Sequence, residues 1–172
     1  MSRKKINKRK KKGKPGSGKH NSLADGCNKQ INENPKNAQA YFIRAQIKHN
    51  QGDLQGAVLD LDEFLSKFPN NLKALIYRAV ILYYLCEYQG AIQDLDDAIL
   101  INPDILSVYL IRGDIYRASG KLEESVDDFD RVIQSSPEEA MAYIGRADTK
   151  LLLHDTEGPM FVIWTSANQK GA

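Results

Sequence analysis

The sequence is short of the residue types that most catalytic and metal-binding sites require. It holds two cysteines and three histidines among 172 residues. Cys27 and Cys86 make neither a disulfide framework nor a metal-ligand pattern. His20, His49 and His154 lie far apart, without metal-ligand spacing or a nucleophile motif beside them. We therefore expect a protein that is not an enzyme and that uses no metal, no cofactor and no small-molecule substrate.

Long apolar runs are also missing. The longest candidate stretch, Ala74 to Leu85, is interrupted by Arg78 and is too short to cross a bilayer. No basic start is followed by the apolar segment of a secretory signal. These absences predict a soluble protein without membrane contact. We expect it in the cytoplasm, or in the nucleus if its basic segment is an import signal.

Acidic residues are absent from the first 19 positions, which carry ten lysines and arginines. The remaining 14 basic and 22 acidic residues give residues 20–172 a net charge of −8. Residues 1–21 have too little apolar content to offset the entropy of ordering, so we predict a disordered basic tail. The run of Lys8, Arg9, Lys10, Lys11 and Lys12 fits a nuclear-import signal or a patch that binds nucleic acid or another polyanion, and a tail that only aids solubility explains it equally well.

Proline is scarce, and four of the six prolines recur at a constant interval: Pro35, Pro69, Pro103 and Pro137. A fixed period of about 34 residues indicates stacked repeats, each too small to bury its own apolar face. Aligned on the prolines, the repeats span 38–71, 72–105 and 106–139, and a partial copy spans 140–157.

Each repeat contains two stretches of helical apolar periodicity with a short turn between them. The first helices are predicted at 38–50, 72–84, 106–118 and 140–153, and the second helices at 54–67, 88–101 and 122–135. Small residues recur at matching positions, where they let helix backbones approach: Ala45, Ala79, Gly113 and Ala147 in the first helices, and Ala57, Ala91 and Ser125 in the second. A capping helix is predicted at 22–34. Pro159 interrupts the fourth copy, so residues 158–172 are predicted to be irregular.

The set of Tyr41, Ala45, Gly52, Ala57 and Pro69, which recurs in the register of the prolines, resembles the tetratricopeptide repeat. The resemblance covers about 38–153. It implies an all-α fold, a right-handed α-solenoid of antiparallel helix pairs, whose first helices line a concave groove. We therefore expect a non-catalytic scaffold or adaptor that binds a peptide or a helix of a partner protein in this groove.

The positions that the resemblance places in the groove are apolar and aromatic in the middle of the chain. The candidate groove residues are Phe42, Gln46, Lys73, Ile76, Tyr77, Val80, Tyr83, Tyr84, Leu110, Asp114 and Arg117. Such a surface suits an amphipathic helix or an extended apolar peptide, with aromatic side chains as anchors. Packing against neighbouring helices is an equal alternative for Tyr77, and Phe42, Tyr83 and Tyr84 are the best candidates for contact with a partner.

Some proteins of this family bind the acidic C-terminal tails of heat-shock chaperones through a clamp of lysine, asparagine and arginine side chains. At the corresponding positions this chain has Phe42, Gln46, Tyr77, Ser107 and Ile111. The clamp is missing at each of them, so we do not expect a chaperone tail as ligand.

Arginines and aspartates also recur in register, at one constant separation. The pairs are Arg44 with Asp60, Arg78 with Asp94, and Arg112 with Asp128. We favour structural ion pairs across each helix pair over a row of arginines that grips an acidic ligand, because buried charges need partners. A second row, Asp62, Asp96 and Asp130, is predicted to face solvent on the convex side. Arg146 has no aspartate of its own.

An alternative hypothesis assigns a binding role to the basic tail. In this hypothesis the protein is a nucleic-acid-associated or nuclear adaptor, whose tail binds RNA or DNA while the repeats recruit protein. The net charge of −8 on the body argues against nucleic acid lying along the solenoid itself.

Overall fold

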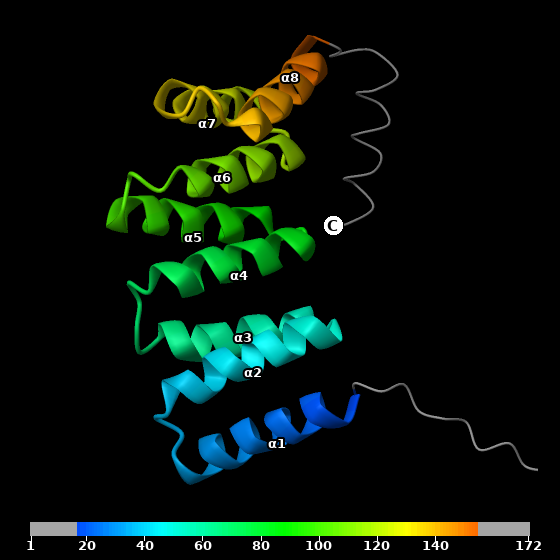
Figure 1. Ribbon diagram of the computed structural model, residues 1–172, viewed down its shortest axis with the longest axis vertical. Helices are drawn as coiled ribbons and strands as arrows, with labels where there is room; N and C mark the ends of the chain where they lie inside the picture. Colours follow the sequence, from blue (N-terminus) through cyan, green and yellow to red (C-terminus); the bar gives the residue numbers. More distant parts are fainter. Residues whose placement is uncertain (1–16, 155–172) are drawn as a thin grey trace, which may run out of the picture.

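The computed structural model describes residues 17–154, which form eight α-helices stacked in chain order (Figure 1). The helices are α1 (Ser17–Glu33), α2 (Ala38–Gln51), α3 (Leu54–Leu65), α4 (Leu72–Tyr84), α5 (Tyr88–Ile101), α6 (Leu106–Ala118), α7 (Leu122–Ser135) and α8 (Ala140–His154). Each helix contacts the next along the stack, and α6 also contacts α4 and α8. Within this range there are no strands, and no helix is long and apolar enough to cross a membrane.

The predicted all-α solenoid of helix pairs is confirmed. The four first helices are α2, α4, α6 and α8, and each begins at the predicted position and ends at most one position beyond the prediction. Helices α5 and α7 have the predicted bounds, whereas α3 ends at Leu65, earlier than the predicted position 67. There the amide of Lys67 bonds to the carbonyl of Phe64, which tightens the last turn, and Pro69 follows where the helix cannot continue.

Helix α1 starts earlier than the predicted capping helix. Its backbone is helical from Ser17, so residues 17–21 do not belong to a disordered tail as the composition predicted. Cys27 and Ile31 are buried against the stack and anchor the helix. Because helix formation is cooperative, an anchored helix extends into adjoining residues that would not be helical alone. The basic run from Lys8 to Lys12 and the predicted irregular segment 158–172 lie outside the described residues.

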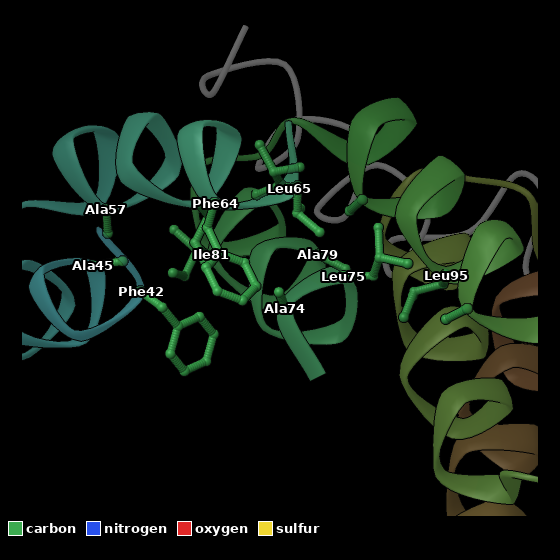
Figure 2. Packing of buried hydrophobic residues seen from close by; sticks show 14 of the residues in the cluster. Phe42, Ala45, Ala57, Phe64, Leu65, Ala74, Leu75, Ala79, Ile81 and Leu95 are labelled. Carbon is green, nitrogen blue, oxygen red and sulfur yellow. The ribbon is translucent and has the colours of Figure 1, made fainter. Parts of the chain in front are cut away.

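The core runs between the two layers of helices. Figure 2 shows Ala45 of α2 and Ala57 of α3 facing each other, with the rings of Phe42 and Phe64 beside them. The small residues let the paired helices approach, and the larger side chains fill the spaces between successive pairs. Each pair therefore buries its apolar face against its neighbours, as the repeat period predicted.

The core of the third repeat carries a coordinated change of volume. Phe129 of α7 occupies the position of Leu61 and Leu95, and Gly113 occupies the position of Ala45 and Ala79. A Cβ atom at Gly113 would lie 3.0 Å from the Phe129 ring, and one at Gly145 of α8 would lie 2.4 Å from it. The two glycines make room for the larger ring.

The turns inside the helix pairs use the left-handed backbone region. Gly52 has φ 84° and Gly120 has φ 83°, and at the equivalent position of the second repeat Cys86 has φ 60°. Glycine occupies this region without the steric cost that a Cβ atom brings. Cys86 therefore holds a strained conformation that its two counterparts avoid.

We predict that Cys86→Gly raises the free energy of unfolding by about 1 kcal/mol, because it removes the Cβ from a left-handed residue. The measurement is chemical unfolding under reducing conditions. Gly120→Ala is the matched control and should lower stability by about 1 kcal/mol at the same turn position of the next repeat. Equal stabilities of the three proteins would show that these turns carry no such strain.

Candidate functional site

A hollow of about 430 Å³ lies between α2 and α4, on the side of the stack formed by first helices. Its lining comes from successive turns along one face of α4 and from one residue of α2. The lining residues are Gln46, Leu72, Lys73, Ile76, Tyr77 and Val80. Leu72, Ile76 and Tyr77 also pack against the core, while Lys73 is exposed. The hollow thus has an apolar floor and a cation at its edge.

Five of the predicted groove residues meet in this hollow: Gln46, Lys73, Ile76, Tyr77 and Val80. Leu72 also lines it and was missed by the sequence reasoning, which did not count the first residue of the helix. The signal was the spacing, because Leu72 stands four residues before Ile76 and so lies on the same face of α4, whose start the side chain of Asn71 fixes by accepting a hydrogen bond from the amide of Ala74 at 3.0 Å.

The side chain of Tyr77 is fixed by contacts with two residues of α2, His49 and Phe42. Its hydroxyl lies 2.7 Å from Nδ1 of His49 in a hydrogen bond, and its ring centroid is 6.1 Å from that of Phe42. Burial raises the pKa of the Tyr77 hydroxyl above its ordinary value, which is already well above neutral pH. Tyr77 therefore both packs against its neighbours, as the alternative interpretation proposed, and offers a fixed apolar surface to the hollow.

The structure corrects the expectation for Phe42. Its side chain is only 7% exposed, and its ring packs against Phe64 at 5.0 Å between centroids. The ring lies in the core that separates the first two repeats, because α4 stacks directly on α2 and α3. Phe42 supports Tyr77 and leaves little surface for a partner.

Tyr83 and Tyr84 lie apart from the hollow, at the C-terminal end of α4. Their ring centroids are 5.8 Å apart, and the ring of Tyr83 also lies 6.2 Å from that of Tyr88 in α5. Tyr83 is partly buried, whereas Tyr84 is 63% exposed. Of the predicted aromatic contacts, Tyr84 has the most surface free for a partner.

The predicted groove residues of the third repeat form a separate, more polar region. Leu110 is partly buried against the cluster around Tyr109 and Phe129. Asp114 accepts a hydrogen bond of 2.7 Å from Nη2 of Arg117, one turn further along α6. The structure does not bring these three residues to the hollow between α2 and α4.

Each predicted ion pair is present as a bidentate contact inside its helix pair. Nε and Nη2 of Arg78 donate to the two oxygens of Asp94 at 2.8 and 2.6 Å. Arg44 binds Asp60 at 2.8 and 2.6 Å, and Arg112 binds Asp128 at 2.8 and 2.7 Å, in the same way. All three aspartates are buried.

The second acidic row does not simply face solvent, as the sequence reasoning expected. The remaining amino group of each arginine reaches the aspartate of the preceding repeat: Arg78 binds Asp62 at 2.6 Å and Arg112 binds Asp96 at 2.5 Å. Arg146 likewise binds Asp130, and Arg44 binds Asn28 of α1 at 2.9 Å. The repeat period revealed both rows, but their contact depends on how neighbouring repeats stack.

The electrostatics of these contacts commit the arginines to structure. Hydrogen bonds to Asp60 and Asp94 raise the pKa of Arg44 and Arg78. Burial raises the pKa of Asp94 and Asp128, and the guanidinium beside each one opposes this. The arginine beside each of these two carboxylates thus offsets part of the effect of burial.

No group of three metal-ligating side chains occurs between residues 17 and 154. The two cysteines of this region are free, Cys27 buried and Cys86 exposed.

A family model described as "Tetratricopeptide repeat" matches residues 50–104 and 78–140. No match was found among curated proteins. Among solved structures, a crystal structure of MamA is 17% identical with a TM-score of 0.73, covering 90% of this chain and 84% of that one. YrrB, described as a protein of this repeat type "with an unusual peptide-binding site", is 17% identical with a TM-score of 0.72, covering 82% and 73%. The first repeat domain of Spaghetti (RPAP3), bound to the HSP90 peptide SRMEEVD, is 23% identical with a TM-score of 0.63, covering 69% and 94%.

We predict that Arg78→Met destabilises the protein by about 3–5 kcal/mol, because it leaves the buried Asp94 carboxylate without its partner. Asp62→Asn is the matched control, since it removes only the half-exposed partner of the same arginine and should cost less than about 1 kcal/mol. Thermal and urea unfolding measure both. A small and equal effect of the two substitutions would contradict a structural role for the buried pair.

Proposed function

The chain belongs to the tetratricopeptide repeat family, and on this premise we propose that it is a protein-interaction scaffold whose hollow between α2 and α4 binds an apolar anchor of a partner. The partner presents this anchor on an amphipathic helix or an extended peptide. The protein itself performs no chemistry in this role. Its contribution is a rigid surface that holds the partner segment.

The hollow is the observation that carries the proposal. Its volume of about 430 Å³ falls within the range of ligand pockets and accommodates one or two large apolar side chains. The floor is preformed, because Tyr77 is fixed by His49 and Phe42 before any partner arrives. A preformed site loses little side-chain entropy on binding, which favours affinity.

The positive charge of Lys73 at the edge of the hollow favours a partner segment that carries an acidic residue. Lys73 is exposed, with Nζ 5.7 Å from the centroid of the Phe42 ring. An acidic residue next to the apolar anchor of the partner would meet this cation. We therefore infer a segment with a large apolar residue and an acidic neighbour.

The HSP90 peptide bound by the Spaghetti domain is a poor guide to this ligand. That peptide, SRMEEVD, is rich in carboxylates. At the clamp positions this chain has Phe42 in the core and Tyr77 hydrogen-bonded to His49. The proposed partner is recognised mainly through apolar burial, without a clamp for the carboxylates. The hypothesis of a nucleic-acid-binding tail concerns residues outside the described part and stays a prediction.

We predict that short peptides selected on the full-length protein from a displayed random library carry an apolar anchor, and that Ile76→Ala weakens their binding roughly tenfold. Ile76 lines the floor of the hollow, so its truncation removes contact area from the anchor. Titration of the selected peptides, followed by fluorescence anisotropy, measures the affinity.

Leu100→Ala is the matched control, since Leu100 is a highly exposed apolar residue of the second-helix layer, away from the hollow. It should leave the affinity unchanged. Peptides that bind both variants equally would contradict the proposed site.

A separate prediction concerns the aromatic edge. Because the Tyr84 side chain is 63% exposed, Tyr84→Ala should leave the unfolding midpoint unchanged. The substitution should lower the affinity for peptides that are long enough to extend from the hollow past the end of α4, and it should leave the affinity for shorter peptides unchanged. Unchanged affinity for every selected peptide would remove Tyr84 from the site.

A further inference from the structure

Helix α8 exposes a face that its three counterparts bury. Ala45 and Ala79 are completely buried against the second helix of their repeats, whereas Ala147, the equivalent residue of α8, is exposed. Leu75 and Tyr109 are each 3% exposed, and Tyr143 at the same position is 40% exposed. In Figure 1, α8 lies at the end of the described stack. The first helix of the fourth repeat therefore lacks a cover among the described residues.

The ion pairs stop at the same place. Arg78 and Arg112 each bind one aspartate of the preceding repeat and one of their own. Arg146 binds Asp130 of the preceding repeat through Nη1. Val162 stands at the position where the other repeats have the aspartate of their own helix pair. Among the described residues, the rest of the guanidinium therefore has no carboxylate of its own repeat.

We propose that residues 159–172, in place of the irregular segment that Pro159 alone predicted, pack on this exposed face of α8 as the second helix of the fourth repeat. The sequence has the right register for it. Gly158, which precedes Pro159, corresponds to Gly56 in the first turn of α3. Met160 corresponds to Val58, Ile92 and Val126. Ile163 corresponds to Leu61, Leu95 and Phe129, which are almost completely buried.

The length and attachment of this segment also favour it as the cover. Positions 155–172 follow His154, which leaves room for a short turn and a helix as long as α3, α5 or α7. The segment is attached at the end of α8, so it competes at a high effective concentration against any free helix. A second copy of the protein could cover α8 only with the opposite end of its own stack, which is α1. The exposed side of α1 suits this role less well, because it carries mostly polar residues such as Asp25, Lys29 and Gln30.

Pro159 sets where this helix begins. It stands at the position of Ala57, Ala91 and Ser125, inside the first turn of the other second helices. Proline lacks the amide hydrogen and is favoured at the first helical residue. The helix therefore starts at Pro159, about one turn later than its counterparts, and covers α8 with Met160 and Ile163 from its first two turns.

The first test compares Ile163→Asp with Phe161→Asp in the full-length protein by thermal unfolding. Phe161 corresponds to Leu59, Gln93 and Asp127, which are all exposed, so it is the matched control in the same segment. Ile163→Asp should lower the unfolding midpoint by roughly 5–10 °C and Phe161→Asp should leave it unchanged. No change in either variant, or an equal loss in both, would overturn the proposal.

The second test restores the missing aspartate. Val162→Asp should raise the midpoint by roughly 2–4 °C when Arg146 is present, and should give no gain in an Arg146→Met background. A loss of stability from Val162→Asp in the presence of Arg146 would overturn the proposed register. The result distinguishes a helix in the register of the repeats from an apolar segment that adheres without order.

The third test asks whether the protein's own C-terminal segment or a second copy covers α8, by measuring the unfolding midpoint at several protein concentrations. If the protein's own segment covers α8, the wild-type midpoint is independent of protein concentration and sedimentation gives the mass of one chain. A midpoint that rises with concentration, together with a dimer mass that Ile163→Asp abolishes, would assign the face to a second copy instead and overturn the proposal.

Discussion

The stack depends on an arginine that binds two aspartates from different repeats. Nε and Nη2 hold the aspartate across the same helix pair, and Nη1 holds the aspartate of the preceding pair. A guanidinium is planar and its donors point in fixed directions. One arginine therefore sets the distance between the two helices of its own pair and the orientation of that pair on the second helix of the preceding one. In a linear array each repeat contacts only its neighbours, and such a link determines how one repeat is oriented on the next.

This link leaves the face of α4 that is turned toward α2 free of structural charges. Arg78 lies on α4 between the residues that line the hollow, yet its side chain is directed to α3 and α5, where its aspartates lie. Ile76, Tyr77 and Val80 remain for the hollow on the side of α2. Helix α4 thus separates its structural charges from the apolar face that lines the hollow.

Interactions that repeat within a helix pair were predictable from the sequence, and those that depend on stacking were not. The repeat period placed the helices and matched Arg44, Arg78 and Arg112 to their buried aspartates, because the separation along the chain is the same each time. The second contact of each arginine, the burial of Phe42 and the separation of Tyr84 from the hollow depend on the angle between successive pairs, which no local pattern encodes. The early start of α1 depends on its packing, and composition alone suggested disorder there.

The large ring of Phe129, with Gly113 and Gly145 on either side of it, has a consequence for how such an array can grow. The first two repeats have leucine and alanine in place of Phe129 and Gly113, and the helices stacked on them carry Tyr77 and Ile111 in place of Gly145. The third repeat fits only below a helix that carries glycine at the position of Gly145, since a Cβ there would collide with the ring. The third repeat is therefore followed without a clash only by a repeat whose first helix has glycine at this position, so its place in the order is fixed by shape.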